Sequence, residues 1–428
     1  MTIREQMHQV KEQSKRLASA SLDERNELLA RIREGLVRDW GEIASANAED
    51  LSRAEAEALK PALKARLVFN EEKRKAVSMG IDDIIALPDP MGRVLEKREL
   101  DTGLVLSRVS VPLGVIGMVF EARPDALVQI VSLAVKSGNG IILKGGSEAL
   151  STNRALAGSI GRSCKGTRVG DGWILLLENR EEVSVMLSAR DDIDLIIPRG
   201  SNSFVSYVME HTDIPVLGHS SGICHLYVES DADLKMACAI AVDAKTNAPS
   251  ACNAIETLLV NRQVAPAFIP MVAKSLREKG VVLHGDAECA AWVPDVVPCQ
   301  EGDWDTEYLA LELNIHVVGS LEEAVEHINR HGSHHTDAIV TSDPEKGRLF
   351  QRLVDSADVF VNASTRFADG YRYGLGAEVG ISTSKIHARG PVGLMGLMTS
   401  KWLLDGSGQV VATYMGPHAK PFTHKELI

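Results

Sequence analysis

The chain has 428 residues, 45% of them hydrophobic, which is enough to bury the cores of roughly two or three domains. Its net charge is −12 and no basic cluster stands out, so we do not expect it to bind nucleic acid. The charged N-terminal segment lacks the apolar core of a signal peptide, and no run approaches about 18 apolar residues, so we expect neither secretion nor a membrane span.

The first half of the chain begins with helical patterns and continues with strand–helix units. Residues 1–78 read as helices with charged faces. Residues 93–111 alternate apolar and polar side chains around Asp101-Thr102-Gly103, which predicts a β-hairpin with a short turn. Strands are predicted at 115–120, 140–144, 173–177, 193–197 and 224–228, and helices at 125–137, 148–163, 180–190 and 201–211. Continuous apolar strands that alternate with helices indicate a parallel sheet covered on both faces.

The alternation restarts at residue 231 and predicts a second α/β domain. Its helices are expected at 231–247, 264–279, 321–330 and 344–355, and its strands at 256–260, 281–284, 314–318, 337–341 and 358–362. The last part of the chain is rich in glycine (GLGAEVGISTSKIHARGPVGLMGLM) and ends in short strand-like and polar stretches.

Cys252 lies between the helical pattern at 231–247 and the strand-like run that begins at Glu256. A thiol at such a junction, flanked by small residues, can receive a flat carbonyl carbon, whereas a thiol inside an apolar helix cannot. The alternative is a small buried hydrophobe, which is how we interpret Cys164, Cys224 and Cys238. The six cysteines show no CxxC pairing, which indicates reduced thiols and a cytoplasmic location.

Two strand–glycine–helix turns are candidates for a nucleotide site, although the GxGxxG fingerprint is absent. The first is Lys144-Gly145-Gly146-Ser147, where a lysine beside a helix N-terminus suits contact with a ribose or phosphate. The second is Pro198-Arg199-Gly200-Ser201, which opens another helix. Either turn alone is more often just a tight connection, but two in one parallel sheet favour a nucleotide.

Four further segments resemble a known family. They are VPLGVIGMVFEARPDA (111–126), SGNGIILKGGSEA (137–149), the His-rich stretch at 317–341 and the Gly-rich stretch at 361–397. With the segment around Cys252, they make nearly the whole chain resemble the aldehyde dehydrogenase superfamily. The resemblance is closer to its γ-glutamyl phosphate reductases (glutamate-5-semialdehyde dehydrogenases). It implies an α/β, aldehyde dehydrogenase-like fold with two doubly wound parallel-sheet domains and a β-hairpin oligomerisation element.

The resemblance also implies a domain organisation. The cofactor-binding domain is expected at 1–92 and 112–225 with part of 363–395, and the catalytic domain at 226–362. The oligomerisation element is expected at 93–111 and 396–428. An exposed two-stranded ribbon is marginal alone and gains stability by pairing with another subunit's edge, so we expect a homo-oligomer.

Site residues are carried over by position. Cys252 matches the nucleophile of the superfamily, and Glu307 matches the glutamate that holds the nicotinamide ribose, although the flanking FGP is missing. Lys144, followed by Gly145 and Gly146, matches the lysine that contacts the adenosine ribose, and Gly200 and Ser201 match the turn near the pyrophosphate. Ser147 replaces a glutamate that is common in NAD-preferring members, so the expected cofactor is NADPH/NADP.

Two departures from the superfamily bear on the reaction. Hydrolytic members carry a water-activating glutamate that the corresponding stretch here, IPVLGHSSGICH (214–225), lacks. Ala122 stands where they have an asparagine that binds the oxyanion, which leaves the Cys252 backbone N–H as one candidate for that role. A thioester that water cannot readily resolve fits exchange with phosphate. The expected reaction is the reduction of L-glutamyl 5-phosphate to L-glutamate 5-semialdehyde and phosphate, with the upstream glutamate kinase as a candidate partner.

Several alternatives remain open. Arg389 is either a surface charge or a contact for the substrate's phosphate or carboxylate. Glu121 and Arg123 either face the cleft and bind substrate or form a buried ion pair. His327 and His331 lie four residues apart on a predicted helix and invite zinc, but nothing nearby completes a ligand set, so no metal is expected. The rival functions are a CoA-acylating aldehyde dehydrogenase and a non-catalytic scaffold of the same fold.

Overall fold

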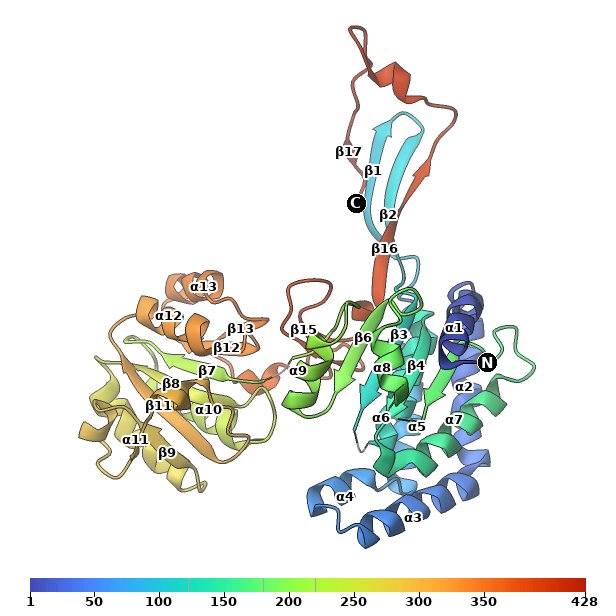
Figure 1. Cartoon of the computed structure of the whole chain (residues 1–428). Coiled ribbons are helices and arrows are strands. Elements are labelled where there is room, and N and C mark those ends of the chain that lie inside the picture. Colours follow the sequence, from blue (N-terminus) through green and yellow to red (C-terminus); the bar gives the residue numbers. More distant parts are fainter. Residues whose placement is uncertain (122, 180, 220) are drawn as a thin grey trace. The chain divides into compact units, whose positions relative to one another are not determined.

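The computed structural model describes residues 1–121, 123–179, 181–219 and 221–428 (Figure 1). The chain forms two compact units. Unit 1 contains Met1–Gly200, Phe204–Leu217 and Gly393–Ile428, and unit 2 contains Ser201–Ser203 and Gly218–Val392. In the described parts, no helix combines the length and apolar character that crossing a lipid bilayer requires.

The core of unit 1 is a parallel sheet with the strand order β5-β4-β3-β6. Its strands are β3 (Val115–Phe120), β4 (Gly140–Gly145), β5 (Ile174–Leu177) and β6 (Leu195–Arg199). Every residue of β3 and β4 is buried, and all of them except Lys144 are apolar. The chain builds from β3 towards β5 and then returns to place β6 on the other side of β3. The carboxyl ends of β3 and β6 therefore flank the switch point where open α/β sheets bind ligands.

Helices surround this sheet and confirm the predicted alternation. They are α6 (Pro124–Ser137), α7 (Leu150–Cys164), α8 (Glu181–Leu187) and α9 (Asn202–Glu210). The N-terminal part of the chain forms α1 (Ile3–Ala18), α2 (Leu22–Arg38), α3 (Trp40–Ala56), α4 (Pro61–Leu67) and α5 (Glu71–Ala86). Capping boxes at Thr2 and Ser21 begin α1 and α2 by satisfying backbone N–H groups of the first turn.

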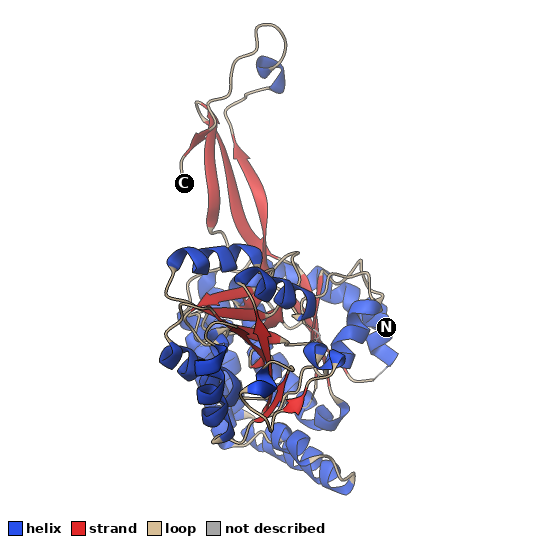
Figure 2. Ribbon diagram, turned by 90° about the vertical axis from the view of Figure 1, so that its left-hand side faces the viewer, coloured by secondary structure: helices blue, strands red, loops and turns tan. Residues whose placement is uncertain are grey.

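A four-stranded antiparallel sheet, which we call the arm, has the order β16-β2-β1-β17. The predicted hairpin forms its centre, as β1 (Val94–Asp101) and β2 (Leu104–Pro112), and Gly103 supplies the positive φ of +71° that the turn requires. The C-terminal part of the chain adds β16 (Met398–Asp405) and β17 (Lys425–Glu426) along the two edges. Figure 2 shows the strands of the arm as a narrow ribbon, with the short 3-10 helix η6 (Val411–Tyr414) near its tip.

The core of unit 2 is a parallel sheet of seven strands in the order β10-β9-β11-β8-β7-β12-β13. These are β7 (Cys224–Val228), β8 (Ile255–Asn261), β9 (Val282–Gly285), β10 (Val297–Pro298), β11 (Glu312–Val318), β12 (Thr336–Val340) and β13 (Asp358–Val361). Its helices are α10 (Leu234–Thr246), α11 (Ala265–Arg277), α12 (Leu321–His331) and α13 (Pro344–Leu353). The short pair β14 (Gly380–Ser382) and β15 (Gly390–Val392) follows.

The structure corrects the sequence analysis at two segments. The strand predicted at 224–228 was grouped with the first domain, but β7 pairs with β8 and β12 in the sheet of unit 2. Residues 363–392, which were partly assigned to the cofactor domain, also lie in unit 2. In both cases a buried apolar or glycine-rich segment shows no local sign of which sheet it will join, because that depends on partners far away in the chain.

Candidate active site

Cys252 lies where the sequence predicted it, in the loop between the end of α10 at Thr246 and the start of β8 at Ile255. The loops that enter the neighbouring parallel strands bring further groups to the same edge of the sheet. Gly222 precedes β7, Glu307 precedes β11 and His335 immediately precedes β12. The candidate site of unit 2 is thus built at the amino ends of its strands.

The thiol of Cys252 faces His335, and their Sγ and Nε2 atoms are 3.2 Å apart. His335 is fully buried, and its Nδ1 lies 2.8 Å from the hydroxyl of Thr336. Burial, followed by the negative charges of Glu307 and Glu378, raises the pKa of Cys252 to about 12. Burial, followed by the charge of His219, lowers the pKa of His335 to about 3. The resting pair is therefore a neutral thiol in a hydrogen bond with a neutral imidazole.

Gly222 supports Cys252 through backbone contact. A Cβ atom on Gly222 would lie 2.0 Å from the Cys252 carbonyl oxygen, so no side chain fits at this position. The Gly222 N–H donates to Glu307 Oε1 at 2.9 Å, and the thiol of Cys224 donates to the Cys252 carbonyl at 3.2 Å. The stretch that lacks the hydrolytic glutamate thus fixes the backbone of the nucleophile loop.

A cationic side chain also acts on the thiol. Arg366 follows β13 and is half-buried, and its positive charge opposes the rise in the pKa of Cys252. Burial lowers the pKa of Arg366, which shows that its charge is poorly solvated. The Asn253 amide donates to the Ala368 carbonyl at 2.8 Å and ties this loop to the residue next to Cys252. An incompletely solvated guanidinium beside a nucleophile suits a phosphate leaving group.

Arg389 is held by an ion pair at the same edge of the sheet. Its Nη1 lies 3.1 Å from Asp355 Oδ1, and its Nη2 donates to the Asp355 carbonyl at 3.0 Å. The ring of His334, next to His335, donates to that carbonyl at 2.6 Å. Arg389 is therefore a residue with an ion-pair partner, and its contact with substrate stays a prediction.

The predicted nucleotide residues of unit 1 gather at the switch point of its sheet. Lys144 ends β4 with only 8% of its surface exposed, and its amine donates to the Gly145 carbonyl. A Cβ atom on Gly145 would lie 2.1 Å from the Asn153 amide, and one on Gly200 would lie 2.8 Å from the Glu121 carboxyl carbon. Neighbouring side chains stand against both glycines, so no larger residue fits there, and the binding of a dinucleotide at these residues stays a prediction.

The remaining predicted residues are placed as follows. Ser147 begins a short 3-10 helix (Ser147–Ala149), and the carboxylate of Glu148 folds back to about where a Gly146 side chain would stand. The hydroxyls of Ser201 and Ser203 are 3.3 Å apart, and the Asn202 amide donates to Glu307 Oε2. Arg123 is exposed at the position before α6. Ala122, the predicted oxyanion position, lies outside the described residues.

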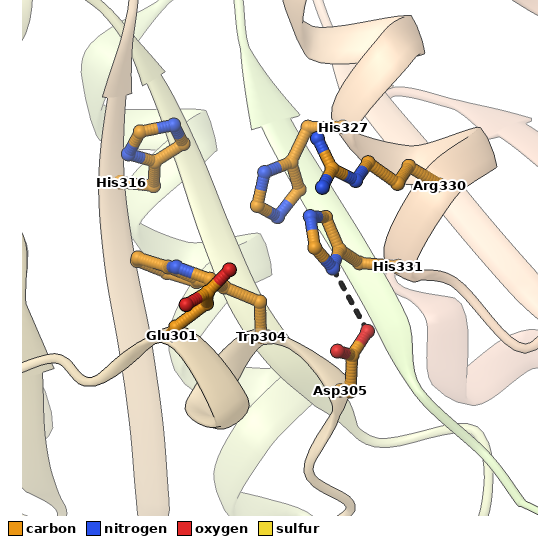
Figure 3. A pocket seen from close by; sticks show the side chains of 7 residues that line it. All are labelled: Glu301, Trp304, Asp305, His316, His327, Arg330 and His331. Atoms are coloured by element: carbon orange, nitrogen blue, oxygen red, sulfur yellow. Dashed lines mark hydrogen bonds and ion pairs between the residues drawn. The ribbon is translucent and has the colours of Figure 1, made fainter.

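The histidines that invited a zinc interpretation line a separate pocket in unit 2 (Figure 3). His327 and His331 lie on α12 and, with His316 of β11, line a cavity of about 450 Å³. The ring centroid of His327 lies 5.1 Å from that of His316 and 4.7 Å from that of His331. The Nδ1 atoms of His316 and His331 bond to Asp286 at 2.6 Å and to Asp305 at 2.8 Å. Burial, followed by neighbouring histidines, lowers the pKa of His327 to about 2. These rings therefore form a polar packing cluster with neutral His327 at its centre.

The chain is similar to proteins of described function. A model of the aldehyde dehydrogenase family matches residues 1–290. A γ-glutamyl phosphate reductase of Cyanothece sp. is 51% identical over 427 residues, which cover 100% of this chain and 98% of that protein. The crystal structure of γ-glutamyl phosphate reductase from Thermotoga maritima has a TM-score of 0.94 at 39% identity, over 95% of this chain and 99% of that chain. An acetylating aldehyde dehydrogenase from Geobacillus thermoglucosidasius has a TM-score of 0.62 at 15% identity, over 95% and 97%, and shares the fold alone.

Proposed function

Because this chain belongs to the aldehyde dehydrogenase family and, within it, to the γ-glutamyl phosphate reductases, we propose that it reduces L-glutamyl 5-phosphate. The products are L-glutamate 5-semialdehyde and phosphate, and the reaction is the second step of proline biosynthesis from glutamate. The observation that carries the proposal is the Cys252–His335 pair, 3.2 Å apart, in a chain whose 214–225 stretch has no acid to activate water.

The first half of the reaction transfers the acyl group to Cys252. As Sγ forms a bond to the acyl carbon, its proton passes to His335 Nε2, the acceptor within hydrogen-bond reach. The carbon–oxygen bond to phosphate then breaks and leaves a γ-thioester on Cys252. The phosphate leaves as an anion, and we propose that the guanidinium of Arg366, whose charge acts on the thiol, offsets the charge of that anion.

The negative charge of the substrate's phosphate group also helps the proton transfer from Cys252 to His335. Burial makes an imidazolium at His335 costly in the free enzyme. An acyl phosphate beside the ring supplies an opposite charge, which raises the pKa of His335 at the moment when it must accept the proton. The neutral resting pair thus protects the thiol until substrate is bound.

The chain uses a nicotinamide cofactor, as a member of its family. We propose that Lys144, beside Gly145 and Gly146, contacts its adenosine ribose, that Gly200 and Ser201 lie near its pyrophosphate, and that Glu307 holds the nicotinamide ribose. NADPH, when bound, supplies the hydride that reduces the thioester carbonyl. The oxyanion that results collapses to the aldehyde as the carbon–sulfur bond breaks, and His335 returns its proton to the departing sulfur of Cys252.

We also propose that the arm joins copies of the chain into a homo-oligomer. Strand β16 forms one edge of the arm and exposes Trp402, Leu403 and Leu404 by 52%, 41% and 57%. Exposed apolar residues along an unpaired edge favour association with another strand. The cytoplasmic location, the glutamate kinase partner and the preference for NADPH over NADH stay predictions.

The proposed function is tested in the reverse direction with glutamate semialdehyde, phosphate and NADP⁺, by the absorbance of the NADPH formed. We expect turnover that requires phosphate and disappears in Cys252→Ala. Equal turnover without phosphate would mean that water resolves the thioester and would overturn the proposal. Turnover of acyl-CoA but not of glutamyl phosphate would assign the chain to the CoA-acylating alternative.

A further inference from the structure

Three potential metal ligands meet at Cys252. The ligand atoms of His219, Cys252 and His335 all lie within 4.8 Å of one another. Within the ranges that the structure describes, no other group of three or more histidine, cysteine or acidic side chains reaches this spacing. The proposed reaction explains the pairing of Cys252 with His335, but it gives no role to His219.

The two imidazoles are oriented as metal-binding histidines are. The Nδ1 of His219 lies 3.1 Å from the Ile381 carbonyl, which can only accept, so Nδ1 carries the proton and Nε2 the lone pair. The Nδ1 of His335 is engaged by the Thr336 hydroxyl, which leaves Nε2 directed at Sγ. Histidines that bind a metal through one nitrogen usually donate the other N–H to a carbonyl or a similar acceptor.

The atom types suit zinc, and so does the spacing between Cys252 and His335. A tetrahedral zinc ion separates its sulfur and nitrogen ligands by roughly 3.3–3.6 Å, and the observed distance from Sγ to Nε2 is 3.2 Å. One thiolate with two imidazoles is a soft ligand set that selects zinc over magnesium or calcium. The negative charges of Glu307 and Glu378 act on the thiol, and they add an attraction for a divalent cation.

We propose that His219, Cys252 and His335 form a zinc site that reversibly blocks the nucleophile. Zinc binding releases the thiol proton to solvent and forms a sulfur–zinc bond, while the fourth coordination position takes water. The occupied thiol can neither attack an acyl carbon nor be alkylated. The proposal that zinc binds here does not depend on the reaction. The expected inhibition of the reductase reaction by zinc rests on the proposed function.

The histidine pocket in Figure 3 provides the matched control. His327 and His331 lie on one face of α12, so they are the obvious competitors for an added metal ion. His331 lies outside the proposed reaction machinery. Replacing His331 by glutamine therefore tests the competing site without touching the nucleophile.

The experiment is a titration of the metal-free protein with Co²⁺, which reports a thiolate ligand by charge-transfer absorption in the near ultraviolet. We expect one bound Co²⁺ with this band and loss of the band in Cys252→Ala. In His219→Asn we expect the affinity for Co²⁺ to fall by about tenfold or more. His331→Gln should bind as the unsubstituted chain does. Zn²⁺ should displace Co²⁺ and slow the alkylation of Cys252 by iodoacetamide. Addition of EDTA should remove the zinc and restore the rate of alkylation.

The outcomes separate the two proposals. Binding that survives Cys252→Ala but is lost in His331→Gln would place the metal in the histidine pocket and overturn the inference. A spectrum without a charge-transfer band would overturn it as well. Reductase activity is measured separately in EDTA, so a chain that binds zinc but does not reduce glutamyl phosphate contradicts only the proposed function.

Discussion

Lys245 and Glu256 form a fully buried ion pair, with Nζ 2.6 Å from Oε2, at the two ends of the loop that carries Cys252. Lys245 lies in the last turn of α10 and Glu256 lies in β8. Burial lowers the pKa of the lysine and raises the pKa of the glutamate to about 7, while each partner's charge opposes that change. The pair clamps the nucleophile loop in a place where neither charge is stable alone.

We therefore expect Lys245→Met to destabilise the protein by about 3–5 kcal/mol, because it leaves a buried carboxylate without its partner. The double variant Lys245→Met/Glu256→Met should recover most of this loss. The measurement is urea denaturation, with Arg262→Met as the control. Arg262 pairs with Glu288 on the surface, where solvent screens the pair and its contribution to stability is small. A double variant as unstable as the single one would contradict the clamp.

Gly222→Ala should disable the enzyme without unfolding it. The added Cβ would overlap the Cys252 carbonyl, so the nucleophile loop must move. A displacement of about 1 Å at a reacting group costs on the order of 10²-fold in rate, and we expect kcat to fall by about that factor. Gly302→Ala is the matched control, because its Cβ would meet no atom within 4 Å. Unchanged kcat in Gly222→Ala would show that the close contact has no catalytic role.

The alkylation of Cys252 should be slow at neutral pH and should keep rising well above pH 9. Its pKa is raised to about 12, so the reactive thiolate is the minor form throughout this range. The rate constant with iodoacetamide, followed by peptide mass spectrometry, should increase about tenfold per pH unit between pH 8 and pH 10. A plateau below pH 9 would mean that the thiol ionises in the ordinary way and that the neutral pair does not exist.

His335→Gln should lower kcat by about 10²- to 10⁴-fold, the usual contribution of a general base. The affinity for NADPH should not change, because His335 contacts the thiol and not the predicted nucleotide residues. The comparison is steady-state kinetics with NADPH binding measured by fluorescence, and His331→Gln serves as the control. If both histidine variants lose the same fraction of activity, the role of His335 is only structural.

Lys144→Met should weaken the cofactor more than it slows the reaction. The methionine keeps the bulk of the side chain but removes a charged donor, which contributes about 1.5–3 kcal/mol to a hydrogen bond. The KM for NADPH should therefore rise by about 10- to 100-fold with a smaller change in kcat. Lys165→Met changes an exposed lysine just after α7 and should leave both constants alone. Equal KM values in the two variants would remove Lys144 from the cofactor site.

The sequence predicted most elements because their signals are local. The strands at 115–120 and 224–228 match β3 and β7 residue for residue, since runs buried on both faces are continuously apolar. The position of Cys252 at a helix-to-strand junction was confirmed because the helical pattern before it and the strand-like run after it are local signals as well.

The groups around Cys252 could not be predicted in this way. His335 and Cys252 meet across 83 residues, and that contact exists only because β12 and β8 flank β7 in one sheet. The sole local hint was a pair of histidines directly before a predicted strand. Likewise, nothing near Lys245 or Glu256 marks them as partners, because burial and pairing are properties of the finished sheet.

The pairing of an early strand of unit 1 with a strand from the C-terminal part of the chain has a consequence for folding during translation. Strand β2 pairs along its length with β16, and the Leu397 carbonyl accepts from the Asn139 amide at 2.9 Å. On the ribosome, the strands of unit 1 emerge first, yet their last partner emerges only after all of unit 2. The early strands must therefore wait with an open edge, at risk of aggregation, until unit 2 has been synthesised and β16 follows it.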